Sequence, residues 1–129
     1  MRWDEAITAV MQRLNDDAVL TAALGSDHIV RASESTSPPL PGVVYQVTSS
    51  QQRENEEVVF TRWDMRAATL DEVVAIEERL RANLDRTLPE TVSGLPMWLE
   101  YVDGWDVPEA PAGTAQRTVL FRFTVLREH

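Results

Sequence analysis

The sequence contains no cysteine, no lysine and no long run of apolar residues. Without cysteine the chain cannot form disulfides, thiolate nucleophiles or cysteine-based zinc sites. No segment reaches the ~18 consecutive apolar residues of a membrane-spanning helix. The segment Met1–Glu5 carries early acids and lacks the apolar stretch of a secretion signal. We therefore expect a soluble protein that is made and used in a cytoplasm, without membrane contact.

Positive charge is also scarce, since 12 basic residues stand against 21 acidic ones and the net charge is −9. Binding to nucleic acid relies on basic side chains that displace counterions from phosphates. The densest basic group, Arg79, Arg81 and Arg86, is interleaved with acidic residues, which is typical of a solvated helix face. The charge pattern therefore argues against proteins that bind nucleic acid or acidic membranes.

The length of 129 residues predicts a single domain spanning residues 1–129, large enough to bury a hydrophobic core. Apolar residues recur at helical spacing from Trp3 to Leu14. Either Asp16 or Asp17 can cap a second short helix over Ala18–Leu24. We expect the following stretch, Ser26–Pro41, to be irregular, with a brief strand at residues 28–30 as an option.

The remaining chain alternates apolar and polar residues in a manner typical of strands. Between the first two strands, the polar link Gln51–Glu56 lacks a tight-turn signal, so we expect a long, exposed hairpin loop. Between the last two strands, Asp103–Gly113 is rich in turn-forming residues. Four strands are predicted, at Gly42–Ser50, Glu57–Ala67, Met97–Val102 and Thr114–Arg127.

A third helix is predicted over Thr69–Arg86, because Thr69 and Glu72 fit a capping box ahead of an apolar face. The element order is then two helices, two strands, a helix and two strands. This order predicts an α+β fold, with a four-stranded, mainly antiparallel sheet packed against an amphipathic helix and the N-terminal helices.

We find no constellation of residues that predicts catalysis. His28 and His129 lack the orienting partner and nucleophile that a general base requires. Two acidic groups could bind a cation through carboxylate oxygens, but solvated acidic turns are common and the spacing is not that of an EF-hand. These groups are Glu54, Glu56 and Glu57, and Asp103, Asp106 and Glu109. We therefore expect neither enzymatic activity nor a cofactor or bound metal.

Four tryptophans are many for this length, and most of them are expected in the core. Tryptophan is also enriched at interfaces between proteins. Trp63, on a strand among charged residues, and Trp105, in a turn, are the candidates for such an anchor.

Several segments together resemble one known family. A first helical region ends in Val19–Gly25, and Pro41 precedes a strand over Val43–Val47. The strand Val58–Met65 leads through Ala67–Thr69 into an amphipathic helix, and Leu120–Val125 closes the fold. In this pattern the chain resembles the tail terminator, or tail completion, proteins of long-tailed bacteriophages. The stretch His28–Arg31 matches a more basic segment of that family only in part.

The resemblance implies a structural protein of the virion, located at the head-proximal end of the tail and assembled in the host cytoplasm. Family members form a ring, typically a hexamer, that caps the tail tube and stops its polymerisation. The expected partners are other copies of the chain, the tail tube protein and a neck or head-completion (stopper) protein. Genomic DNA would pass through the channel without specific binding, which the negative charge favours.

The exposed hairpin and the proline-rich loop are the segments that we expect to contact neighbouring rings. The candidate interface residues are Pro38, Pro39, Gln51, Gln52, Arg53, Glu54, Asn55, Glu56, Glu57 and Trp63. Two alternatives stay open. The chain could be another neck or minor-tail component of the head–tail connection, or a cytoplasmic, dimeric α+β regulatory or binding module.

Overall fold

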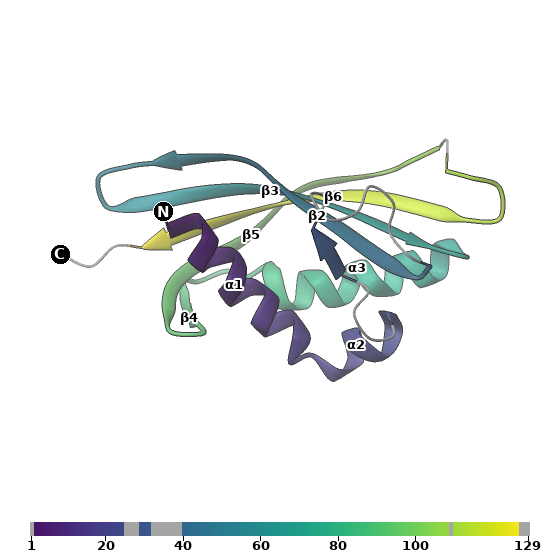
Figure 1. The fold of residues 1–129 in the computed structure, drawn as a ribbon, viewed down its shortest axis with the longest axis horizontal. Helices are drawn as coiled ribbons and strands as arrows, with labels where there is room; N and C mark the ends of the chain where they lie inside the picture. Colours follow the sequence, from purple (N-terminus) through teal and green to yellow (C-terminus); the bar gives the residue numbers. More distant parts are fainter. Residues whose placement is uncertain (1, 25–28, 32–39, 109, 127–129) are drawn as a thin grey trace.

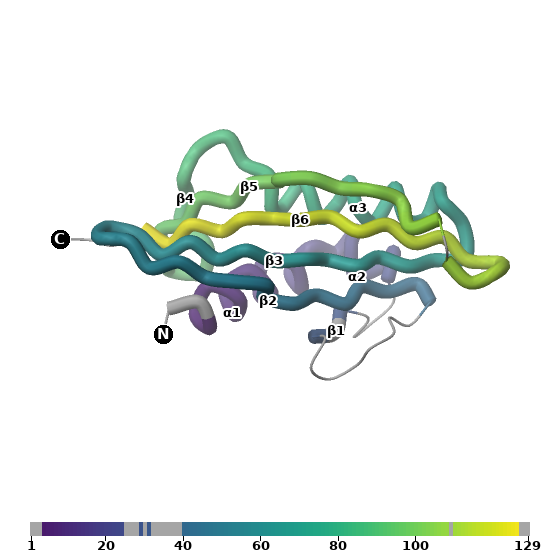
Figure 2. The backbone as a smooth tube through the Cα atoms, turned by 90° about the horizontal axis from the view of Figure 1, so that it is seen from above, coloured from purple at the N-terminus to yellow at the C-terminus, as the bar shows by residue number. Residues whose placement is uncertain are grey.

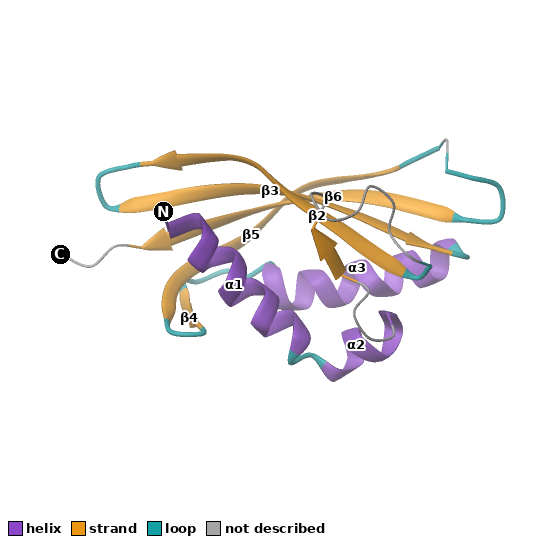
Figure 3. Cartoon of the chain, viewed as in Figure 1, coloured by secondary structure: helices purple, strands orange, loops and turns teal. Residues whose placement is uncertain are grey.

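A computed structural model describes residues 2–24, 29–31, 40–108 and 110–126. Helices lie on one side of a long sheet, and the opposite face of the sheet is left open (Figure 1, Figure 3). In the described residues, the elements are α1 (Arg2–Asn15), α2 (Ala18–Leu24), β1 (Ile29–Arg31), β2 (Gly42–Gln52), β3 (Glu56–Ala67), α3 (Leu70–Leu84), β4 (Glu90–Val92), β5 (Leu95–Asp106) and β6 (Ala115–Leu126).

The sheet has the strand order β1-β2-β3-β6-β5-β4 across the described residues, as Figure 2 shows from above. Every neighbouring pair from β2 to β4 is antiparallel, and β1 adds to the edge in parallel. The expected α+β class and the antiparallel sheet are confirmed, but the expected number of four strands is wrong. The two extra strands, β1 and β4, are three residues long and are defined by the neighbours they pair with.

The connections between strands also differ from expectation. The hairpin loop is short, because β2 runs on to Gln52, β3 already begins at Glu56, and the Arg53 amide donates to the Glu56 carbonyl at 2.8 Å. The turn-rich stretch after residue 102 is in part a strand, because β5 continues through Gly104 to Asp106 in register with β6. The β2–β3 hairpin and the β5–β6 hairpin both extend the sheet beyond the helical layer (Figure 1).

The helices form where the sequence predicts them. The Asp17 carboxylate caps α2 by accepting hydrogen bonds from the amides of Val19 and Leu20, at 2.9 and 3.0 Å. The Thr69 hydroxyl caps α3 by accepting from the Glu72 amide at 3.2 Å. Gly25, the expected end signal of the second helix, lies outside the described residues. None of the described helices is long and apolar enough to cross a membrane.

The core lies between the helical layer and the sheet. Alternate residues of β3, from Val59 to Ala67, face the helices, as the period-two pattern predicts. Trp63 is the largest of the fully buried side chains, and its ring stacks on Tyr45 with centroids 5.0 Å apart. The helices contribute one apolar face each to this core, through Ala6, Val10, Leu14, Leu20, Leu24, Val73, Ile76, Leu80 and Leu84.

Candidate interaction surface

The open face of the sheet has no helix in front of it, as the view from above shows (Figure 2). Side chains on this face come from the residues of each strand that alternate with the core-facing ones. Two cross-strand rows run through its middle. They are Gln46–Arg62–Leu120–Asp103 and Ser49–Phe60–Arg122–Glu100.

Several charged side chains on the open face are paired with one another. Glu100 of β5 lies opposite Arg122 of β6, and the guanidinium donates to both carboxylate oxygens at 2.9 and 3.2 Å. These hydrogen bonds raise the pKa of Arg122 above its ordinary value, against the smaller effect of burial. In β3, Arg62 donates to Asp64 at 3.3 Å, and Thr118 of β6 donates to the same carboxylate at 2.5 Å.

The net charge of this face differs from that of the chain. In the described strands and hairpin turn, its basic residues are Arg53, Arg62, Arg66 and Arg122, and its acidic residues are Glu54, Glu56, Asp64, Glu100 and Asp103. Four positive charges against five negative ones leave −1, whereas the whole chain carries −9. A nearly neutral face on an acidic chain is the side by which another acidic protein can approach with least repulsion.

Exposed apolar side chains gather on β5. Trp98, Val102 and Trp105 are 37%, 48% and 40% exposed. Trp98 borders a shallow depression of about 250 Å³ that Arg53, Val58 and Arg122 also line. Exposed tryptophan beside arginine is the composition that interface hot spots favour.

Trp105, the anchor candidate that we expected in a turn, lies within β5. Trp98 was not among the candidates. The alternation of β5, in which Met97 and Leu99 are fully buried and Trp98 lies between them, is the signal that would have identified it.

The candidate interface residues of the hairpin fall into two groups. Gln51, Gln52, Arg53, Glu54 and Asn55 are exposed at the tip, and Glu56 is half-buried. Arg53 holds the turn by an ion pair with Glu56 at 2.9 Å and a hydrogen bond to the Gln51 side chain at 3.3 Å. Glu57, by contrast, is only 5% exposed.

Trp63 does not lie on the surface. It is 0% exposed, and its indole donates to the Thr61 hydroxyl at 2.8 Å inside the core. The suggestion that it anchors an interface is therefore wrong for this structure: Trp63 sits at a core-facing position of β3, although the open-face positions beside it are charged. Pro38 and Pro39 lie outside the described residues.

Among the residues that the structure describes, those considered for chemistry are not brought together into a site. His28, His129 and Glu109 lie outside the described residues, and within the described ranges no group of three or more His, Asp or Glu side chains could hold a metal. Asp106 instead pairs with Arg117 at 3.1 Å, and Arg117 also contacts Glu77 of α3. The hydrogen bond to Glu77, and to a smaller extent the one to Asp106, raises the pKa of Arg117. Through Arg117, α3 is joined to the end of the sheet.

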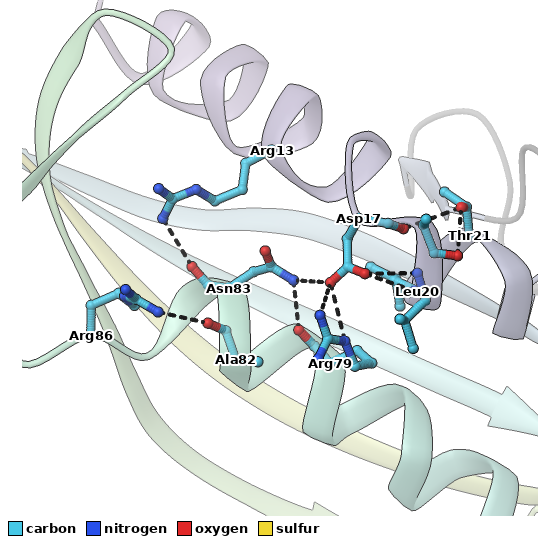
Figure 4. A network of polar contacts seen from close by, with 10 residues as sticks. Arg13, Asp17, Leu20, Thr21, Arg79, Ala82, Asn83 and Arg86 are labelled. Atoms are coloured by element: carbon cyan, nitrogen blue, oxygen red, sulfur yellow. Dashed lines mark hydrogen bonds and ion pairs between the residues drawn. The ribbon is translucent and has the colours of Figure 1, made fainter.

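A polar network joins the helices behind the sheet (Figure 4). Asp17 receives hydrogen bonds from Arg79 and Asn83 of α3, and Arg13 of α1 donates to the Asn83 carbonyl at 3.2 Å. Arg13 also pairs with Glu90 of β4. The network holds α1, α2 and α3 in fixed relative positions, so the helical layer supports the sheet as a rigid base.

Two further depressions border α1. One, of about 380 Å³, lies beside the β4–β5 turn and is lined by Glu5, Ala9 and Leu95 among others. The other, of about 600 Å³, lies towards β1 and β2 and is lined by Met11, Arg31 and Tyr45 among others.

No model of a protein family matches the sequence, and no curated protein matches it. Several solved structures share its fold, and two of them are the following. A chain from the virion of a native gene transfer agent particle is 18% identical, with 92% of each chain covered and a TM-score of 0.66. A second protein, whose name carries no functional description, is 9% identical over 95% of this chain and 97% of that chain, with a TM-score of 0.57. Likeness at these identities establishes the fold and leaves function to be argued from the surface.

Proposed function

We propose that this chain is a structural subunit of a phage-type virion that caps the head-proximal end of the tail tube as a ring. The observation that carries the proposal is the fold shared with a gene transfer agent virion chain over 92% of both chains. The sequence independently resembles tail terminator proteins. In this role the chain stops tube polymerisation and presents the surface that docks the neck or stopper protein. Its place is the virion tail, after assembly in the host cytoplasm.

The surface chemistry supports an assembling subunit. A closed ring needs heterologous contacts, in which one patch of a subunit meets a different patch of the next. The open sheet face, with paired charges and the exposed side chains of Trp98 and Trp105, offers contact area that the helices do not cover. The hairpin tip projects past the helical layer (Figure 1), which supports a role for it in contacts with a neighbouring ring.

The negative charge suits a channel that DNA must traverse. A subunit with a net charge of −9 repels a phosphate backbone, so DNA passes without being retained. Three arginines of the open face, Arg53, Arg62 and Arg122, are paired with acids, which lowers their attraction for phosphate.

Native mass spectrometry over a range of concentrations, followed by end-on negative-stain imaging, tests the ring. We expect closed rings, most simply hexamers, either alone or after addition of tail tubes built from the tube protein of the same particle. Rings at one end of each tube would support the capping role. A tight dimer that does not bind tubes would favour the binding-module alternative. Rings that bind a neck protein but not tubes would favour another connector component.

The hairpin tip is proposed to contact the adjacent ring, together with the loop Ser33–Pro41. Glu54→Arg reverses a charge at the exposed turn, and Glu78→Arg makes the same change on the exposed side of α3. We expect Glu54→Arg to leave the subunit folded and to reduce capping of tubes, while Glu78→Arg retains capping. Equal capping by the two variants would remove the hairpin from the contact.

A further inference from the structure

The two outer long strands of the sheet are only partly covered. Strand β1 pairs with β2 at Val43–Tyr45, and β4 pairs with β5 at Leu95–Met97. Across the described residues, no strand lies beside the rest of either edge. We name the outer side of Gln46–Gln51 the β2 edge, and the outer side of Val102–Asp106 the β5 edge.

The β2 edge lacks the charged residues and the proline that commonly protect an edge strand. Natural sheets place charged residues or proline on exposed edges, because these prevent the pairing of strands between molecules. All 11 residues of β2 are uncharged and none is proline, although 26% of the chain is charged. The other long strands each carry charge, including two arginines in β6 and two aspartates near the end of β5. A bulge at Thr48 is the one irregularity of β2.

The β5 edge is covered in its first half and open in its second. The Arg86 amide donates to the Leu99 carbonyl at 2.8 Å, and Asp85 accepts from the Tyr101 amide at 3.3 Å, so the segment after α3 takes the place of a strand there. Beyond this point Val102 and Trp105 are exposed. Exposed apolar side chains beside an open backbone edge indicate a surface that becomes covered.

We propose that the β2 edge of one copy of this chain pairs antiparallel with the β5 edge of the next copy, so that the sheet continues from subunit to subunit. The inference rests on the proposed ring. A ring requires a heterologous contact between two different patches, and the two edges are these patches. Charge argues against a contact between two β5 edges, because Asp103 and Asp106 of one copy would lie against the same acids of the other. An uncharged β2 edge meets these acids without repulsion.

The positions of the short strands set the stagger between copies. Within one subunit, Ser49 lies level with Glu100, and Val44 lies level with Trp105. To place Ser49 opposite Asp103 of the next copy, the two sheets must shift along the strands by roughly two residues of the regular strands β3 and β6, or about 7 Å. In a closed sheet a shift of this kind appears as strand tilt, so the stagger is compatible with ring closure.

Engineered cysteines test the pairing against a clean background, because the chain has none of its own. We expect the double variant Ser49→Cys/Asp103→Cys to give a ladder of disulfide-linked oligomers up to the full ring on mild oxidation, in the presence of tail tubes if rings require them. The single variants Ser49→Cys and Asp103→Cys should give no ladder. Dimers from Ser49→Cys alone would show β2 pairing with β2 and would overturn the proposal.

A second pair of variants tests the contact without a cross-link. Ser49→Asp places an acid opposite Asp103, and Ser49→Asn is its uncharged control of similar size. We expect Ser49→Asp to raise the concentration for half-assembly by about tenfold, and Ser49→Asn to stay near the parent. The edge pairing is overturned, and the proposed ring retained, by either of two outcomes. In the first, Ser49→Asp forms rings at the same concentration as the parent, and in the second, the double cysteine variant forms rings that do not cross-link. Absence of rings under all conditions, tubes included, would overturn the ring itself.

Discussion

Asp17 and Arg79 are joined by two hydrogen bonds to one carboxylate oxygen: Nη2 and Nε of Arg79 lie 2.7 and 3.2 Å from Asp17 Oδ2 (Figure 4). Asn83 donates to the same oxygen at 2.6 Å. The other oxygen, Oδ1, caps α2. One carboxylate thus ends the turn after α1, begins α2 and fixes both against α3.

The charge of Asp17 should make the fold sensitive to acid. Burial alone would raise the pKa of this carboxyl, but the hydrogen bonds from Asn83, the Leu20 amide and Arg79 lower it from 3.8 to about 2. Because the pKa is lower in the folded chain than in the unfolded chain, the stabilisation is complete above about pH 4 and is lost as the pH falls towards 2. It amounts to about 2 kcal/mol.

Urea unfolding between pH 7 and pH 2 measures this effect. Asp17→Asn should lower the free energy of unfolding at neutral pH, and its difference from the parent should shrink below pH 4. Asp16→Asn, a change at the exposed neighbouring residue, is the control and should follow the parent. A constant difference between Asp17→Asn and the parent at every pH would assign the loss to packing rather than to charge.

Gly104 lies under Tyr101 in β5, and a side chain there would not fit. A Cβ on Gly104 would lie 2.5 Å from Tyr101 Oη and 3.0 Å from Val119 Cγ1. The tyrosine ring has little freedom to move, because Arg81 covers it at 3.9 Å and Phe121 meets its edge at 5.8 Å. Gly104→Ala should therefore destabilise the chain by about 1–3 kcal/mol.

The close approach of Tyr101 to Gly104 can be isolated with a double-mutant cycle. Tyr101→Phe removes the nearest atom, so Gly104→Ala should cost less in the Tyr101→Phe background than in the parent. Thermal unfolding of the four proteins gives the coupling. If the losses in free energy of unfolding are additive, Val119 and not the Tyr101 hydroxyl causes the destabilisation by Gly104→Ala.

The core contains a chain of hydrogen bonds that depends on Thr61. The Trp63 indole donates to the Thr61 hydroxyl at 2.8 Å, and this hydroxyl donates to the Phe121 carbonyl at 2.9 Å. Thr61→Val keeps the shape but leaves the buried indole N–H without its acceptor, which should cost about 1–3 kcal/mol. Thr91→Val, at an exposed position of β4, is the control. Denaturant unfolding of both variants is the measurement, and equal small effects would mean that the indole finds another acceptor.

The elements that sequence predicted best are those with long, local signals. The helix α3 has a capping threonine and an apolar face of Val73, Ile76 and Leu80, and β3 alternates over its whole length. The strand β4 was missed because Glu90–Val92 is extended only by pairing with β5, which no local pattern reveals. At Gly104 the Asp-Gly pair reads as a turn, yet cross-strand pairing with β6 keeps the chain extended.

The candidate surface was predictable only in part, for the same reason. The hairpin tip is recognisable from its polar run, but the length of its loop follows from the pairing of Gln52 with Glu57. Trp63 stands between the charged residues Arg62 and Asp64, whereas Trp98 stands between the apolar residues Met97 and Leu99. Each tryptophan faces the side of the sheet opposite to its neighbours, so Trp63 is buried and Trp98 is exposed, but which face the helices cover is a tertiary property.

The Arg122–Glu100 pair offers a test of whether the open face is covered on assembly. In the isolated chain both side chains are partly exposed, and exposed pairs couple by about 0.2–1 kcal/mol. Double-mutant cycles with Arg122→Gln and Glu100→Gln, measured once by unfolding of the subunit and once by assembly, compare the two states. If the face is buried between subunits, removal of water strengthens the pair and each single variant leaves an unpaired charge, so the coupling in assembly should exceed that in folding. Equal couplings would show that the open face stays in contact with solvent in the assembled particle.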